Sequence, residues 1–215
     1  RVAIPIAEAE VDIVGVDFSE AMLGVARRKA AERTLPGSLT LVHGDMRDLA
    51  PDLGGQERFA LVIIPFRGFL SLLTVEDEVR ALVNLKRHLA PEGRLAFNVF
   101  VPDLNMLVQE GDLPYHFRDV TNPDTGERLV LWHQSRYDNA NQIVNARTIV
   151  EELDDEDAVK RRLYRDFQIR YVHRWEMHHL LRLCGYEVLD LFGDFDRSPF
   201  DESSTEMVWI ARPTG

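Results

Sequence analysis

The acid that ends the apolar run Val11–Asp17 is the first candidate for chemistry. The run reads VDIVGVD, and its short β-branched composition indicates a strand buried on both faces of a parallel sheet. An acid at the carboxyl end of such a strand faces the edge where α/β sheets bind ligands. The Asp17 carboxylate can accept both hydroxyls of a ribose, or it can stabilise the amino end of a following helix. The residue alone leaves both interpretations open.

A second candidate group, His43-Gly44-Asp45-Met46, ends and follows the expected strand 39–43. Gly44 permits the backbone to approach a flat ligand closely. Asp45 can accept a hydrogen bond from an exocyclic amine, and the Met46 amide can donate one to a ring nitrogen. The alternative is a tight turn in which Asp45 accepts hydrogen bonds from nearby backbone N–H groups.

The third group follows the apolar run 59–64 and reads Ile64-Pro-Phe-Arg-Gly-Phe69. At the carboxyl end of a strand, Phe66 or Phe69 can line an apolar wall, and Arg67 can bind a carboxylate. A surface turn with buried aromatic side chains accounts for the same residues equally well.

The elements that must position these groups alternate along the first hundred residues. Strands are expected at 11–17, 39–43, 59–64 and 94–101, with a helix at 19–33 and another behind Thr74, whose spacing to Asp77 resembles a capping box. Residues 1–9 resemble a helix. Alternation with short links predicts a doubly wound, mostly parallel, Rossmann-like α/β sheet.

The pattern changes between residues 103 and 171. Turn signals at 122–126, 138–141 and 153–157 separate strand-like runs, which predicts an inserted antiparallel meander of three or four strands. A helix at 174–184 and closing strands at 186–192 and 207–211 return to the first pattern. We therefore expect a core formed by residues 1–102 and 172–215, with an insertion at 103–171.

The composition of the 215 residues excludes several classes of protein. Lysine and arginine number 25 against 36 acids, a net charge of −11, which disfavours general binding to nucleic acid or to an anionic membrane. No apolar stretch reaches the roughly 18 residues that a membrane span needs. The single cysteine, Cys184, allows no internal disulfide, and no carboxylate or histidine spacing indicates a metal site. A reducing, cytoplasmic setting fits.

The ordered set of segments resembles the class I S-adenosylmethionine-dependent methyltransferases. The segments that carry the resemblance are VGVDFSEAM at 14–22, HGDMRDL at 43–49, FALVII at 59–64, LKRHLAPEGRL at 85–95 and RYVHRWE at 170–176 with LCGY at 183–186. The resemblance spans most of the chain outside residues 103–160, and no single motif in it is specific.

The resemblance implies S-adenosylmethionine as cofactor and a role for each matching residue. Asp17 would hold the ribose hydroxyls, and Phe18 would lie against the adenine. Asp45 would accept from the adenine amine, and Met46 would offer its backbone amide. The segment that begins at Ile64 and includes Phe66 and Arg67 would face the methionine moiety and the substrate.

The family also has a first strand and a glycine-rich loop, which should stand just before Arg1. Because residues 1–9 resemble the helix after that loop, we expect the natural protein to contain both. The meander at 103–171 resembles the substrate lid of some small-molecule methyltransferases. Candidate substrate-facing residues are Tyr115, Trp132 and His173. No catalytic base is identified, because the sequence favours none of the candidates His116, His133, His173 and Tyr171 over the others.

Three hypotheses for the function follow. The first is methyl transfer to a nitrogen or oxygen nucleophile of a small molecule by in-line displacement, carried out by a monomer or homodimer. The second is a nicotinamide-dependent oxidoreductase, since an acid that closes the second strand serves that cofactor too. The third is a non-catalytic relative that binds a nucleoside, if the glycine-rich loop is absent.

Overall fold

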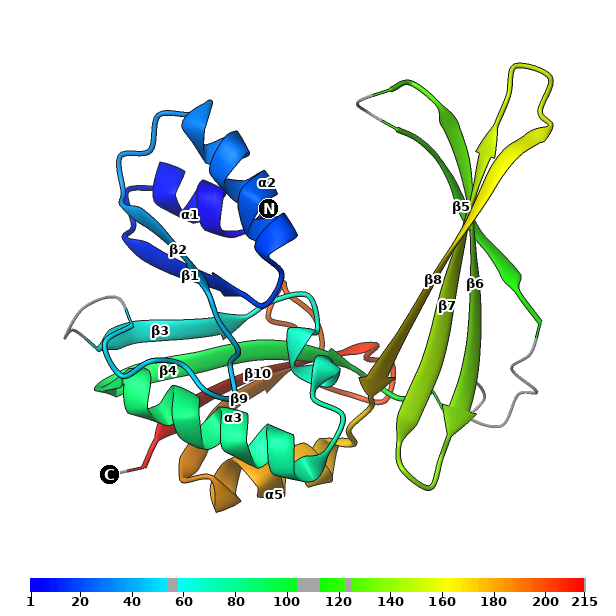
Figure 1. The fold of residues 1–215 in the computed structure, drawn as a ribbon. Coiled ribbons are helices and arrows are strands. Elements are labelled where there is room, and N and C mark those ends of the chain that lie inside the picture. Colours follow the sequence, from blue (N-terminus) through cyan, green and yellow to red (C-terminus); the bar gives the residue numbers. More distant parts are fainter. Residues whose placement is uncertain (54–57, 104–112, 123–124, 215) are drawn as a thin grey trace.

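The computed structural model describes residues 1–53, 58–103, 113–122 and 125–214, which form three sheets with flanking helices (Figure 1). The elements of the core are α1 (Ala3–Glu8), β1 (Ile13–Asp17), α2 (Glu20–Ala31), β2 (Leu39–His43), β3 (Phe59–Ile64), the 3-10 helix η1 (Gly68–Ser71), α3 (Val75–His88), β4 (Leu89–Phe100), α5 (Arg174–Leu183), β9 (Tyr186–Phe192) and β10 (Glu206–Pro213). The elements of the insertion are β5 (Tyr115–Thr121), β6 (Arg128–Asp138), β7 (Ile143–Leu153) and β8 (Val159–Arg170).

Local capping signals set where the helices begin. The Ser19 hydroxyl accepts the Met22 N–H at 3.3 Å and starts α2. The Thr74 hydroxyl accepts the Asp77 N–H at 3.1 Å and starts α3, as the spacing predicts. These hydrogen bonds satisfy amide groups that the first helical turn leaves without partners.

The α/β class is confirmed, and the expectation of one mostly parallel sheet with a closing antiparallel strand is met in part. Strands β1 and β2 form a separate parallel pair, while the other core strands have the order β3-β4-β10-β9. Only β3 and β4 are parallel within that second sheet, because β10 pairs antiparallel with both β4 and β9. In the described residues no ladder joins β1 or β2 to β3. The two parallel pairs therefore stand apart, and antiparallel ladders predominate.

One edge of the core collects the ends of most strands. We call it the carboxyl edge: the last residues of β1, β2, β3 and β4 with the loops that follow, and the first residues of β10, which runs the opposite way. Figure 1 shows these strands running toward the insertion, so the carboxyl edge faces it. Polar side chains from distant parts of the sequence can meet there.

The hydrophobic core lies between the sheet β3-β4-β10-β9 and the helices α3 and α5. Leu82 of α3 and Leu181 of α5 are fully buried together with Leu95 and Trp209 of the sheet. Phe69 of η1 is also fully buried, and its ring lies 5.2 Å from that of Phe97. Each helix in the described part of the chain is too short or too polar to span a bilayer.

The expected meander is present as an antiparallel sheet of four strands in the order β5-β6-β7-β8, which we call the inserted sheet. Residues 104–112 and 123–124 of the expected insertion lie outside the described residues. Figure 1 shows the inserted sheet standing beside the core, with the β6–β7 turn at its base. The β7–β8 turn lies at the opposite, distal end.

A buried ionic network joins the base of the inserted sheet to the core. Arg170, the last residue of β8, donates through Nη1 to both carboxylate oxygens of Glu78 in α3, at 2.9 and 3.0 Å. Its Nη2 donates to Gln142 in the β6–β7 turn and to Glu176 in α5. Glu78 is fully buried, and burial raises the pKa of its carboxyl to about 7 although Arg170 opposes the rise.

Candidate functional site

One oxygen of the carboxylate that ends β1 accepts a hydrogen bond within the turn that follows the strand. Asp17 Oδ1 accepts the Ser19 N–H at 2.8 Å, which fixes the entry into α2. In the described chain Oδ2 of Asp17 has no protein donor, so it is open to a ligand. The structure therefore shows Asp17 stabilising the turn at the amino end of α2, while contact of its other oxygen with a ribose stays a prediction.

The loops after β1 and β2 lie side by side, as expected for parallel strands. The register pairs Asp17 with His43, and the Gly44 N–H donates to the Asp17 carbonyl at 3.1 Å. The His43 ring is hydrogen-bonded to the Phe18 carbonyl at 2.9 Å. The Phe18 side chain is 73% exposed, which leaves an apolar surface free at this edge. A Cβ added at Gly44 would lie 3.1 Å from Val16, so glycine lets the loop pack closely.

Asp45 accepts from a nearby backbone N–H, as the tight-turn alternative predicts, and it also binds the Arg47 side chain, which the sequence did not indicate. Its carboxylate accepts from Arg47 Nε at 3.0 Å and from the Arg47 backbone N–H at 2.9 Å, while Arg47 Nη1 donates to Asp77 at 2.8 Å. These hydrogen bonds from Arg47 lower the pKa of Asp45. Asp45 is therefore ionised at neutral pH, and a ligand amine would have to share it with Arg47.

Met46 and Ile64 are positioned by the core. Met46 packs against the hydrophobic core, and its carbonyl accepts from Asn84 Nδ2 at 3.2 Å. Within the described residues its N–H has no protein acceptor, which leaves a donor available at the carboxyl edge. Ile64 is buried as the last residue of β3. It supports the loop after β3 rather than presenting an exposed surface.

The loop after β3 has an unusual backbone. Phe66 and Arg67 both adopt left-handed conformations, with φ of 57° and 59°. Such a conformation costs a residue with a side chain about 1–2 kcal/mol, so other contacts must hold this turn. Phe66 is exposed, and the Arg1 guanidinium lies 4.3 Å from the centre of its ring.

Arg67 binds a carboxylate, as its type suggests, but that carboxylate belongs to the chain. Its Nε donates to Glu206 Oε1 at 2.9 Å, with a second bond from Nη2 to the same oxygen. Asn98 completes the group by donating to Glu206 Oε2 at 3.0 Å. Sequence reasoning missed both Asn98 and Glu206. The signal available was a polar residue inside the apolar strand 94–101 and an acid at the start of the apolar strand 207–211.

The three expected substrate-facing residues do not come together. Tyr115 pairs with His133 and the next residue pairs with Trp132, so Tyr115 and Trp132 lie on opposite faces of the inserted sheet. The Trp132 indole donates to buried Glu151 at 2.9 Å. His173 is the N-cap residue of α5, and its backbone N–H donates to Glu176.

Tyr137 shares the face of the inserted sheet that carries Tyr115. Its ring contacts that of Tyr171 at 6.4 Å. Burial is the main cause that raises the pKa of Tyr137, and the nearby Tyr115 and Asp103 raise it further. Asp103 follows β4, so Tyr137 faces the carboxyl edge and is a better candidate for contact with a substrate than Trp132.

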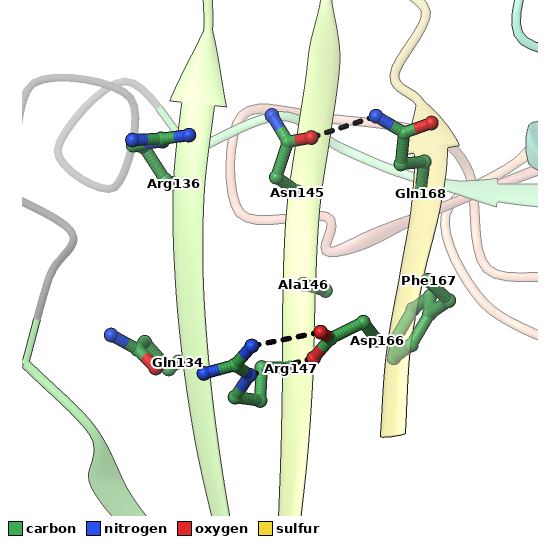
Figure 2. Close-up of a pocket in the computed structure, with 8 residues that line it drawn as sticks. All are labelled: Gln134, Arg136, Asn145, Ala146, Arg147, Asp166, Phe167 and Gln168. Carbon is green, nitrogen blue, oxygen red and sulfur yellow. Dashed lines mark hydrogen bonds and ion pairs between the residues drawn. The ribbon is translucent and has the colours of Figure 1, made fainter. Parts of the chain in front are cut away.

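A hollow of about 550 Å³ lies on the opposite face of the inserted sheet, and Figure 2 shows the residues that line it. Asn145 accepts from Gln168 at 2.7 Å, and Arg147 Nε donates to Asp166 at 2.6 Å. Cross-strand pairs of this kind stabilise a sheet, and no residue of the carboxyl edge lines the hollow. We therefore assign it a structural role. The residues that line it are Gln134, Arg136, Asn145, Ala146, Arg147, Asp166, Phe167 and Gln168.

Comparison with known proteins shows that the chain is similar to methyltransferases. Residues 1–93 match the family described as the methyltransferase domain. The putative methyltransferase YqeM of Bacillus subtilis is 26% identical over 217 residues, which cover 94% of this chain and 76% of that protein. The structure of the CcbJ methyltransferase from Streptomyces caelestis matches with a TM-score of 0.85 and 25% identity, over 99% of this chain and 84% of that one. The chain is therefore similar to S-adenosylmethionine-dependent methyltransferases, in sequence over residues 1–93 and in fold over nearly its whole length.

A further structural match, at lower sequence identity, shows a likeness of fold alone. It is an amino pentose methyltransferase from Micromonospora echinaspora, with a TM-score of 0.68 and 20% identity over 94% of this chain and 74% of that one.

The residues at the carboxyl edge fit the cofactor of the family, S-adenosylmethionine. An open carboxylate oxygen on Asp17, an exposed ring on Phe18 and the N–H of Met46 lie on adjacent loops. Together they offer an acceptor for hydroxyls, a surface for a flat ring and a donor for a ring nitrogen. Asp45 fits less simply, because Arg47 already occupies both of its oxygens.

Proposed function

We propose that this methyltransferase transfers the methyl group of S-adenosylmethionine to a nitrogen or oxygen atom of a small molecule by in-line displacement. The observation that supports the proposal most directly is the register of β1 with β2, which brings Asp17 beside the loop 43–46 at the carboxyl edge. Neither alternative, a nicotinamide-dependent oxidoreductase or a non-catalytic nucleoside-binding relative, is supported by the comparisons.

In this proposal each loop binds one part of the cofactor. Asp17 accepts from the ribose hydroxyls through Oδ2, and Phe18 lies against the adenine. The Met46 N–H donates to a ring nitrogen. The Asp45 carboxylate accepts from the adenine amine while it also keeps its hydrogen bonds with Arg47. Ile64 lies toward the methionine moiety, and the Phe66–Arg67 turn that follows lies toward the substrate.

The cofactor supplies a methyl group activated on a sulfonium centre, so the chain has mainly to bind and orient the acceptor. Holding two reactants in line can lower the barrier by about 7 kcal/mol or more. The turn Phe66–Arg67 and the Tyr115 face of the inserted sheet flank the place where the acceptor would lie. We propose that residues 103–171 act as the substrate lid that keeps water away from the reaction.

We propose an amino sugar as the first acceptor class to test. Among the similar structures are a sugar N-methyltransferase from Streptoalloteichus and the amino pentose methyltransferase already described. The net charge of −11 favours a cationic or neutral acceptor over an anionic one. The aromatic rings of Tyr115 and Tyr137 offer surfaces of the kind that bind sugars and ammonium groups.

Substitution of Asp17 tests the cofactor site. Asp17→Asn keeps an oxygen for the Ser19 N–H but removes the charge that would hold the ribose. Because a hydrogen bond to a charged group contributes about 1.5–3 kcal/mol, we expect affinity for S-adenosylmethionine to fall about 10-fold to 100-fold in calorimetry.

Glu20→Gln is the matched control, since Glu20 is an exposed acid of the same turn whose partner is Arg27. Its affinity should equal that of the unmodified protein. Equal binding by Asp17→Asn and the unmodified protein would contradict the proposed role of Asp17. Binding of NAD without binding of S-adenosylmethionine would reject the methyltransferase reaction.

The acceptor class is tested by release of S-adenosylhomocysteine in the presence of amino sugars and of the matching neutral sugars. We expect release with the amino sugars, together with a methylated product in mass spectrometry. Release with the neutral sugars alone would indicate an oxygen nucleophile. No release with either set, despite tight binding of the cofactor, would refute the proposed acceptor class.

A further inference from the structure

The turn that borders the proposed acceptor site is held by a polar group that no motif indicated. Arg67, Asn98 and Glu206 come from the loop after β3, from β4 and from the start of β10. We propose that these three residues form a positioning cluster, which fixes the Phe66–Arg67 turn and thereby orients the methyl acceptor. This inference rests on the proposed function, because it assigns the turn to the acceptor rather than to the cofactor.

The hydrogen bonds of the positioning cluster form a closed set. The Arg67 backbone N–H donates to Asn98 Oδ1 at 3.3 Å, and Asn98 Nδ2 donates to Glu206 Oε2 at 3.0 Å. The other oxygen of Glu206 accepts from the Arg67 side chain. Arg67 is thus held at both its backbone and its side chain. These hydrogen bonds stabilise a turn in which two residues other than glycine have a left-handed backbone.

Burial separates this cluster from an ordinary surface ion pair. Asn98 is 5% exposed, and the Glu206 side chain is 12% exposed. Exposed ion pairs contribute little to stability, whereas buried ones fix the geometry of the elements that they join. The Arg67 side chain remains half exposed and lies over the Phe100 ring at 5.4 Å, so the cluster reaches from the sheet to the surface of the carboxyl edge.

The bonding pattern assigns orientation rather than proton transfer to Glu206. Oε1 of Glu206 accepts twice from Arg67 and Oε2 accepts from Asn98, so three hydrogen bonds within the chain already hold this carboxylate in place. The cluster has one positive and one negative charge and is neutral as a whole. It therefore holds the turn without attracting or repelling an acceptor by net charge.

Reversal of one hydrogen bond tests the cluster. In Glu206→Gln the side chain has one acceptor oxygen in place of two. Either Arg67 or Asn98 then loses the acceptor for its donor group. In Asn98→Asp two carboxylates face each other. In the double variant the new amide at position 206 would donate to the new carboxylate at position 98 and accept from Arg67, which restores every bond and the neutral charge.

The assay measures kcat and KM for the acceptor found with the amino sugar panel, with cofactor affinity measured separately. We expect each single variant to lower kcat/KM for the acceptor about 100-fold, the effect of a misplacement of about 1 Å, without changing the affinity for S-adenosylmethionine. The double variant should recover most of the loss. Glu187→Gln, which breaks an exposed pair between Arg212 and Glu187 at the opposite end of β10, is the matched control and should leave kcat/KM unchanged.

Several outcomes would overturn the inference. Single variants as active as the control would show that the turn needs no cluster. A double variant that is as impaired as the singles, or that does not fold, would show that the pattern of donors and acceptors is not what matters. A loss of cofactor affinity in proportion to kcat/KM would place the cluster at the cofactor instead. A lack of turnover by the unmodified protein would instead refute the proposed function.

Discussion

The network around Arg170 makes the strongest prediction about stability. Its side chain is 6% exposed and its partner Glu78 is fully buried, so Arg170→Met would leave an unpaired charge in the core. Removal of one partner of a buried ion pair costs about 3–5 kcal/mol, and we expect a loss of that size in the free energy of unfolding at pH 8. Glu176, the other carboxylate bound to Arg170, would then repel Glu78 as well.

The pH dependence of this loss follows from the pKa of Glu78. That pKa is about 7 with Arg170 present, and loss of the guanidinium would raise it further. At pH 6 the carboxyl of the variant would therefore be protonated, and the destabilisation should be smaller than at pH 8. The double variant Glu78→Gln with Arg170→Met contains no such carboxylate and should recover more than half of the loss.

Urea unfolding followed by circular dichroism at pH 6 and pH 8 measures these differences. Arg212→Met is the control, because Arg212 pairs with Glu187 at the surface and should cost less than about 1 kcal/mol. If Arg170→Met is no more destabilising than the control, or if the double variant is as unstable as Arg170→Met alone, the reasoning about the buried charge is refuted.

Two further predictions concern the unmodified protein and its core. Because the folded-state pKa of Glu78 is raised from 4.5 to about 7, the folded chain binds a proton more tightly than the unfolded chain. The contribution of this group to the free energy of unfolding should therefore decrease as the pH rises from about 4.5 to about 7, and Glu78→Gln should abolish that part of the slope in urea titrations. Phe69→Ala removes a fully buried ring that packs on Phe97, which should cost about 3–5 kcal/mol in the same assay, whereas Phe66→Ala, at an exposed ring, should cost far less.

The parts of the fold that depend on local signals could be predicted from the sequence. Ser19 and Thr74 cap helices where their spacing indicates, and apolar runs such as 39–43 and 59–64 form strands. The meeting of Asp17 with the loop after His43 also followed, because the carboxyl ends of paired parallel strands share an edge. Whether Asp17 and this loop contact the cofactor stays a prediction.

The features that depend on distant partners could not be predicted. Arg67 and Glu206 are 139 positions apart, and nothing local shows that β10 begins beside the loop after β3. A bulge between His116 and Arg118 shifts the register of β5 against β6, so the sequence alone does not tell which face carries Tyr115 and which carries Trp132.

The position of the inserted sheet has a consequence for how such an enzyme changes in evolution. Its base is clamped to the helices of the core, while the turn 154–158 lies at the distal end and is held by its own hydrogen bonds to Asp154. Hairpins of this kind tolerate added or removed residues at their tips without disturbing the elements below. Added or removed residues at this tip can therefore accumulate without disturbing the base of the inserted sheet or the core.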